Sequence, residues 1–197
     1  VSLGRERDYS AFHIFNVYTG EQIAEFYSNR TPINELAQIL TTEANLYNNA
    51  TVIIERNTIG NNLIDWMFNI YEYDNLWIDD KNDFGIQITT RNREELLARM
   101  EEYIRNNFVR VNSKRTIDEL LTFIVNDNGK ITADDGKNDD LIMSLASTIF
   151  LLHTLADGSP LEMKQNNTEK ERKPLEPMRT TIHDGFDREL EEDVRWL

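Results

Sequence analysis

The segment from Thr51 to Gly60 (TVIIERNTIG) constrains the fold more than any other stretch of the chain. It is a short apolar run, mostly β-branched, that stops on a single carboxylate, Glu55, and is followed at once by a polar turn. A strand with one face in water would alternate apolar and polar residues, and this run does not. We therefore expect a buried central strand over residues 51–55, in a domain that combines strands and helices.

The segments around this strand predict a hairpin and two helices. Tyr9–Tyr18 and Gln22–Ser28 are rich in aromatic and β-branched residues, and a tight turn that contains Gly20 joins them as a hairpin. Pro32 opens a helix whose apolar residues recur with the helical period, and a second amphipathic helix covers residues 59–70. The order is therefore hairpin, helix, buried strand, helix.

The second half of the chain predicts more helices and one more hairpin. Helices are expected over residues 93–106, 116–123 and 139–155. The second of these begins with an S/T-x-x-E capping box formed by Thr116 and Glu119. An Asn-Gly turn predicts a hairpin within residues 124–133. A hairpin that feeds a mixed sheet flanked by helices fits a ribonuclease H-like α/β architecture.

The chain divides into a folded domain and a polar tail. Residues 1–157 carry the strand and helix patterns and form the expected ribonuclease H-like domain. Residues 158–197 are rich in proline and charge, as linkers are, and form the C-terminal tail. The end of the tail predicts a short amphipathic helix, because apolar residues recur there at three- and four-residue steps. These residues are Phe186, Leu190, Val194 and Leu197.

Composition narrows the class of protein. The net charge is −14 and no part of the chain is a basic block, which argues against a protein that coats DNA through Lys and Arg. Cys is absent, which excludes a disulfide framework, a thiol nucleophile and a Cys-ligated zinc. No apolar run approaches the roughly 20 residues that span a bilayer, and Val1–Asp8 lacks the pattern of a signal peptide. We expect a soluble, intracellular protein.

Carboxylates at the ends of two predicted elements indicate a divalent-cation site. Glu55 would stand at the rim where α/β sheets bind ligands, and Asn57 shapes a turn that leaves room for a phosphate group. Asp139 and Asp140 open the last helix, and helical neighbours point about 100° apart, so both cannot face one point. We choose Asp140 as the ligand, with Asp139 behind it or as a second ligand. This pairing is typical of metal-assisted phosphodiester chemistry.

Each of these acids also has a purely structural explanation. Glu55 could form an ion pair with Arg56 or a nearby lysine. Acids in the first turn of a helix complement its dipole and cap free N–H groups. The acids of residues 74–83 lack calcium-loop spacing and are expected to be surface charges. His13 and His153 have no metal-ligand spacing and are expected to be structural.

Three motifs stand in order along residues 1–155. They are Gly4–Phe12 (GRERDYSAF), Ile53–Gly60 (IIERNTIG) and Asn138–Leu145 (NDDLIMSL). Together they resemble the C-terminal nuclease domain of the terminase large subunit, the DNA-packaging motor of tailed bacteriophages, of the T4-like type. The resemblance implies a ribonuclease H-like fold and the cutting of concatemeric viral DNA with divalent metal ions.

Carried over residue by residue, the resemblance places the family's central metal-binding Glu at Glu55 and its late metal-binding Asp at Asp140. Asp8 matches an acid of the early motif that lies near the site without being a principal ligand. The chain departs from the pattern at its start, because the family's first metal Asp ends the opening strand and would stand immediately before Val1. The P-loop motif of the family's ATPase domain is also not found in the sequence, so we expect a fragment.

The favoured hypothesis is therefore a Mg²⁺- or Mn²⁺-dependent DNA endonuclease. Carboxylates would hold two ions about 4 Å apart, with Glu55 on one and Asp140 on the other. Arg56, Arg91 and Arg93 are candidate phosphate contacts, with ordinary surface charge as the alternative. The resemblance implies double-stranded DNA, the portal protein, the ATPase domain and the small terminase subunit as partners, in the host cell cytoplasm and without a membrane. The isolated domain is expected to be monomeric.

Two other hypotheses use the same observations. The chain could be a docking module with no activity in this form, whose acidic surface meets a basic partner. It could also be a resolvase or transposase on the same fold, which would use similar carboxylates and prefer branched DNA. The helix expected within residues 186–197 would dock the nuclease to the portal, or pack on its own domain.

Overall fold

The computed structural model describes residues 9–125, 131–133 and 139–156. The elements in chain order are β1 (Ser10–Phe15), β2 (Gln22–Ser28), α1 (Ile33–Leu46), α2 (Thr58–Asp65), the π-helical turn η1 (Trp66–Ile70), α3 (Thr90–Arg105), α4 (Lys114–Leu120), β3 (Phe123–Val125), β4 (Ile131–Ala133) and α5 (Asp140–Leu155). The described part is thus an α/β structure with small antiparallel sheets, β1–β2 and β3–β4.

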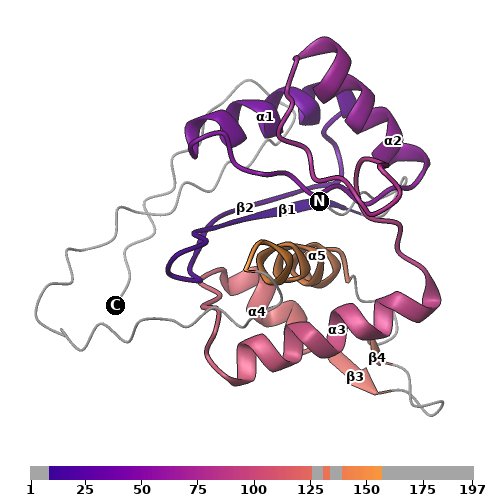
Figure 1. Cartoon of the computed structure of the whole chain (residues 1–197). Coiled ribbons are helices and arrows are strands. Elements are labelled where there is room, and N and C mark those ends of the chain that lie inside the picture. Colours follow the sequence, from indigo (N-terminus) through magenta and orange to yellow (C-terminus); the bar gives the residue numbers. More distant parts are fainter. Residues whose placement is uncertain (1–8, 126–130, 134–138, 157–197) are drawn as a thin grey trace, which may run out of the picture.

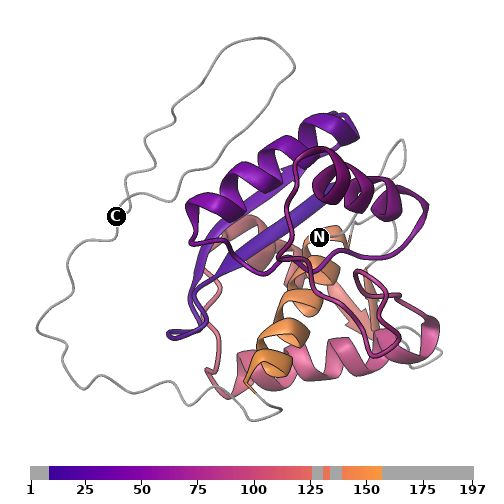
Figure 2. The ribbon, with the colours of Figure 1, turned by 45° about the horizontal axis from the view of Figure 1, so that its top comes forward.

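The β1–β2 hairpin lies between two groups of helices (Figure 1). α1 and α2 cover one face of the hairpin, and α5 packs against the other face, where it contacts β1. α3 packs against α5 in turn, so that α5 is enclosed on both sides (Figure 2). Each layer boundary has its own apolar core, with Phe12, Leu36 and Met67 in the first core and Leu97 and Ile149 in the second.

The predicted N-terminal hairpin is confirmed. β1 and β2 pair antiparallel from Ser10 opposite Ser28 to Ile14 opposite Ala24, and the register shifts after Ile14. Gly20 in the turn has φ +68°, a left-handed conformation that glycine adopts without strain. A Cβ at this position would also collide with the carbonyl oxygen of Phe108. The turn therefore requires glycine for two independent reasons.

The predicted central strand is buried and extended, but it does not form a regular ladder. Val52 pairs in parallel with Leu76, and Glu55 pairs in parallel with Ile86, each as an isolated bridge. Two separate segments share one edge of residues 52–55, so neither can build a continuous run of bonds. The predicted mixed sheet is therefore present only in part, since the strands within the described residues form two-stranded antiparallel sheets and the parallel pairs are isolated bridges.

The helices of the first layer begin and end for local reasons. α1 follows Pro32 as predicted and ends before Asn48 and Asn49, whose φ values of 63° and 53° are left-handed and stop the helix. α2 is capped by the Asn57 side chain, which accepts two backbone N–H groups. α2 then widens into the π-helical turn η1, so the predicted helix over residues 59–70 is present but not α-helical throughout.

The second layer contains the predicted helices, but α4 ends at Leu120 instead of residue 123, Phe123 begins β3, and one predicted cap is wrong. α3 begins with a capping box in which Thr89 and Asn92 bond reciprocally. α4 is capped by Ser113, whose hydroxyl accepts the Thr116 amide at 3.1 Å, so the expected box of Thr116 and Glu119 is wrong. α5 is apolar on nearly every side because it lies between the hairpin and α3.

No helix in the described ranges is both long and apolar enough to cross a membrane. Asp8, the Asn-Gly turn of the second hairpin and the whole tail of residues 158–197 lie outside the described residues. The boundary at residue 157 and the amphipathic helix of the tail therefore stay predictions.

Candidate metal centre

Glu55 lies at the end of the buried extended segment, next to the turn that opens α2. Asn57 organises this turn, because its Oδ1 accepts the amides of Ile59 at 3.0 Å and Gly60 at 2.8 Å. Gly60 packs directly on the backbone of Glu55, and a Cβ at Gly60 would collide with the Glu55 carbonyl oxygen. The start of α2 therefore sets the position of Glu55 at the rim of the core.

The surroundings of Glu55 disfavour its charged form. Burial raises the pKa of the Glu55 carboxyl above its ordinary value, and the nearby Asp139 carboxylate raises it further. A hydrogen bond from the Asn57 side chain acts in the opposite direction. A partly buried carboxylate beside a second carboxylate is an arrangement that a bound cation would stabilise.

Asp139 and Asp140 face different partners, as predicted. Asp139 is the N-cap residue of α5, but its side chain makes no capping hydrogen bond. Its Oδ2 lies 2.7 Å from Nη2 of Arg93 on α3. Asp140 is 9% exposed, and its Oδ2 accepts the backbone amide of Tyr9 at 3.0 Å. The start of α5 is thus tied to α3 through one acid and to the start of β1 through the other.

Glu119 is a further acid at this place, where it does not form the predicted capping box with Thr116. Its Oε1 accepts the Ile142 amide at 3.0 Å, so Glu119 on α4 caps the first turn of α5. Burial raises the pKa of Glu119 to about 7, and the charges of Asp140 and Asp139 add to this effect. No local pattern could have shown this contact, because it joins two helices that lie far apart in the chain.

These carboxylates fit a divalent cation as part of a ligand set. Oxygen donors of this type are those that Mg²⁺ and Mn²⁺ prefer. Glu55 lies within electrostatic reach of Asp139, and Glu119 lies within reach of both Asp139 and Asp140. Within the described ranges, however, no group of three or more Asp, Glu or His side chains is arranged to hold a metal ion.

The predicted phosphate-contacting arginines occupy different environments. Arg56 forms ion pairs with Asp79 at 3.0 Å and Asp83 at 2.8 Å. Arg93 pairs with Asp139 in the candidate site, and Arg91 is exposed at the start of α3. A hollow of about 350 Å³ lies beside Arg56, and it is lined by further cationic side chains that no sequence motif indicated. Its lining includes Trp77, Lys81, Asn92 and Arg99.

An apolar groove of about 540 Å³ lies between β1 and the extended segment. Residues 12–18 form one wall and residues 48–53 form the opposite wall. Leu40 of α1 and Leu151 of α5 contribute to the remaining sides. The groove therefore separates two lengths of extended backbone and lies between the two helical layers.

The fold is known from solved structures, although no protein-family model matches the sequence. The large terminase nuclease from thermophilic phage G20c with bound magnesium is 21% identical, with a TM-score of 0.63 over 75% of this chain and 77% of that chain. The same nuclease with bound cobalt is 20% identical, with a TM-score of 0.62 over 76% and 78%. With bound zinc, the identity is 20% and the TM-score 0.56 over 78% and 77%. The described part of this chain therefore has the fold of the large terminase nucleases.

Proposed function

We propose that this chain is the nuclease domain of the large terminase subunit of a tailed bacteriophage, of the T4-like type, and that it cuts concatemeric double-stranded DNA during genome packaging. The observation that carries the proposal is that Glu55, at the end of the buried extended segment, lies within electrostatic reach of Asp139 at the start of α5. The three sequence motifs and the shared fold support the same assignment.

Glu55 and Asp140 would hold divalent ions, with Asp139 as a further ligand. The carboxylate donor set supports Mg²⁺ or Mn²⁺, and the solved nucleases of this fold are described with magnesium, cobalt or zinc bound. When bound, two such ions supply activation of a water molecule and stabilisation of the leaving 3′-oxygen. The protein's own part is to orient the acids: Arg93 holds Asp139, and the Tyr9 amide holds Asp140.

The sheet of this domain would be ribonuclease H-like once an opening strand occupies the apolar groove. β1 begins beside Asp140, at the start of α5, and runs away from it. The extended segment of residues 52–55 ends at Glu55. A strand between them would lie antiparallel to β1 and parallel to residues 52–55, so its last residue would stand beside Glu55. The resemblance implies a metal-binding Asp at the end of the family's opening strand, which would add a further carboxylate to Glu55 and Asp140.

DNA would reach the site past the arginines. Arg91 is exposed, and Arg56 would contact a phosphate by exchanging an aspartate partner for the DNA backbone. Arg93 would add a phosphate contact while it holds Asp139, because a guanidinium carries five N–H donors. Because the chain carries −14, this contact depends on bound metal ions and on basic partners. The proposed partners are the ATPase domain, the portal protein and the small terminase subunit, in the host cell cytoplasm, with the isolated domain monomeric.

The direct test is plasmid cleavage by an extended protein, in which an opening strand that ends in the family's metal-binding Asp is joined to the start of this chain. Supercoiled plasmid should be nicked and linearised with Mg²⁺ or Mn²⁺ and left intact with EDTA. Glu55→Gln and Asp140→Asn should abolish cutting, whereas Asp74→Asn, at an exposed loop position, should cut like the wild type. Equal cutting by all variants would remove these acids from the site.

The acidic charge favours a second candidate, a docking module without activity of its own. If the extended protein binds a basic partner and never cuts plasmid, this candidate replaces the nuclease. Faster cutting of branched than of linear DNA would instead indicate a resolvase or transposase on the same fold.

A further inference from the structure

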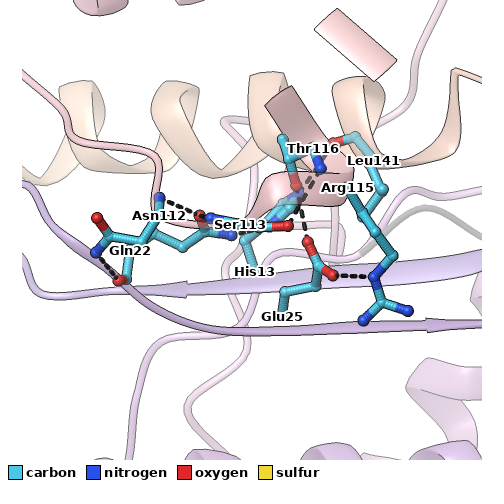
Figure 3. A network of polar contacts seen from close by, with 8 residues as sticks. All are labelled: His13, Gln22, Glu25, Asn112, Ser113, Arg115, Thr116 and Leu141. Carbon is cyan, nitrogen blue, oxygen red and sulfur yellow. Dashed lines mark hydrogen bonds and ion pairs between the residues drawn. The ribbon is translucent and has the colours of Figure 1, made fainter. Parts of the chain in front are cut away.

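A buried chain of hydrogen bonds joins the hairpin to the first turn of α5 (Figure 3). His13 on β1 is 8% exposed, and its Nε2 lies 3.0 Å from the carbonyl oxygen of Leu141, the residue that follows Asp140. Its Nδ1 lies 2.8 Å from Nε2 of Gln22, which is 1% exposed on β2. A contact between β1 and α5 therefore lies one residue from the proposed metal ligand.

The backbone amides at one end of this hydrogen-bond network determine which group donates in every bond of it. The backbone amides of Asn112 and Ser113 can only donate, and both donate to Oε1 of Gln22, at 2.8 and 2.9 Å. The Gln22 amide group must then donate to Nδ1 of His13. A neutral imidazole with an acceptor at Nδ1 carries its proton on Nε2, so His13 donates to the Leu141 carbonyl.

A charged imidazole carries a proton on Nδ1 as well, and this proton would face the donating Gln22 amide and break that bond. A flipped ring would no longer place Nε2 on the Leu141 carbonyl oxygen. Burial lowers the pKa of His13 to about 4, so the ring is neutral at physiological pH and keeps this tautomer. Each hydrogen bond therefore has a fixed donor, from the backbone amides before α4, through Gln22 and His13, to the Leu141 carbonyl in the first turn of α5.

α4 holds the first turn of α5 from a second point. Glu25 on β2 accepts Nε of Arg115 at 2.7 Å and the hydroxyl of Thr116 at 2.8 Å, which attaches the start of α4 to the hairpin (Figure 3). Glu119 near the end of α4 accepts the Ile142 amide. The Leu141 carbonyl and the Ile142 amide are thus both held from outside the helix.

We propose that His13 is a positioning residue for the metal site: it holds the Leu141 carbonyl and thereby sets the place of Asp140 relative to Glu55. The inference rests on the proposed function, because it assigns Asp140 to the metal. Outer partners of metal ligands typically change metal affinity by about 10- to 100-fold when they are removed.

The test compares three variants of the extended protein. His13→Leu removes the donor, and His13→Gln keeps an N–H donor near the position of Nε2. His153→Leu is the matched control, because His153 lies near the other end of α5 and contacts Tyr103 on α3 at 2.8 Å. If His13→Leu does not fold, His13→Asn replaces it, since its shorter side chain cannot reach the Leu141 carbonyl.

Two readouts separate positioning from general stability. The first is amide hydrogen exchange in the first turn of α5, at residues 143–145, without metal. His13→Leu should speed this exchange about tenfold, the effect expected for one lost hydrogen bond, and His13→Gln should restore it. The second is Mn²⁺ affinity measured by calorimetry, which His13→Leu should weaken about tenfold or more and His153→Leu should leave unchanged.

The outcomes distinguish this inference from the proposed function. Unchanged exchange in His13→Leu overturns the inference, and so does faster exchange with wild-type Mn²⁺ affinity. If the wild-type extended protein binds no Mn²⁺, the proposed function fails and the assignment of Asp140 to a metal fails with it. Exchange in the first turn of α5 then shows by itself whether His13 orders that turn.

Discussion

The guanidinium of Arg93, near the start of α3, lies 2.7 Å from the carboxylate of Asp139 at the start of α5. This ion pair joins two helices that pack along their length, and it holds Asp139 on the side of the helix start that influences Glu55. Arg93 therefore has two possible uses in a nuclease, which are to orient an acid of the site and to contact a phosphate.

Arg93→Gln should weaken cleavage by the extended protein far more than it weakens the fold. The ion pair is partly exposed, so its loss should lower the free energy of unfolding by less than about 1 kcal/mol in urea denaturation. Plasmid cleavage should fall by about tenfold or more, because Asp139 loses the partner that orients it. Arg105→Gln, which removes the exposed pair with Glu101, is the control and should cut normally. Wild-type cutting by Arg93→Gln would exclude both uses.

Gly60→Ala should destabilise the fold through the backbone of Glu55. An added Cβ would collide with the Glu55 carbonyl oxygen, and backbone cannot move aside as a side chain can. We expect the free energy of unfolding to fall by about 1–3 kcal/mol, the usual cost of overpacking. Asn61→Ala, at the next and exposed position of α2, should change it by less than about 0.5 kcal/mol. Equal stability of the two variants would show that the turn accommodates a Cβ at position 60 without a collision.

His13 should make the fold less stable as the pH falls. Its pKa is about 4 in the folded protein and about 6.5 when unfolded, so between these values the unfolded chain binds the extra proton. Its contribution is complete above pH 6.5 and is lost progressively toward pH 4, at no more than about 1.4 kcal/mol per pH unit. Urea denaturation between pH 7.5 and 4.5 should show a shallower slope for His13→Gln than for the wild type. Parallel slopes would mean that His13 does not titrate in this range.

The elements that local patterns define were predictable from the sequence. Gly20 between two aromatic strands indicated the N-terminal hairpin, and apolar periodicity indicated all the long helices. The position of Glu55 at the end of a buried extended segment also followed from the run before it. The prediction that Asp139 and Asp140 face different partners was also correct, although Asp139 is the N-cap residue and lies just outside the helix.

The contacts between distant segments were not predictable in this way. Residues 52–55 share one edge with two short segments, and nothing in the run shows which partners it takes. Glu119 was assigned to a cap on its own helix, but it caps α5 instead. His13 was expected to be structural, and its bond to Leu141 depends on the tertiary arrangement of the hairpin and α5.

The most direct test of the account is the position of bound Mn²⁺ in crystals of the extended protein, located by its anomalous scattering. The account predicts Mn²⁺ coordinated by the carboxylates of Glu55 and Asp140, at the usual distance of roughly 2.1–2.2 Å for a small divalent ion on oxygen. Mn²⁺ bound only elsewhere, for example among the acids of residues 79–83, or no Mn²⁺ at a concentration that supports cleavage, would contradict it.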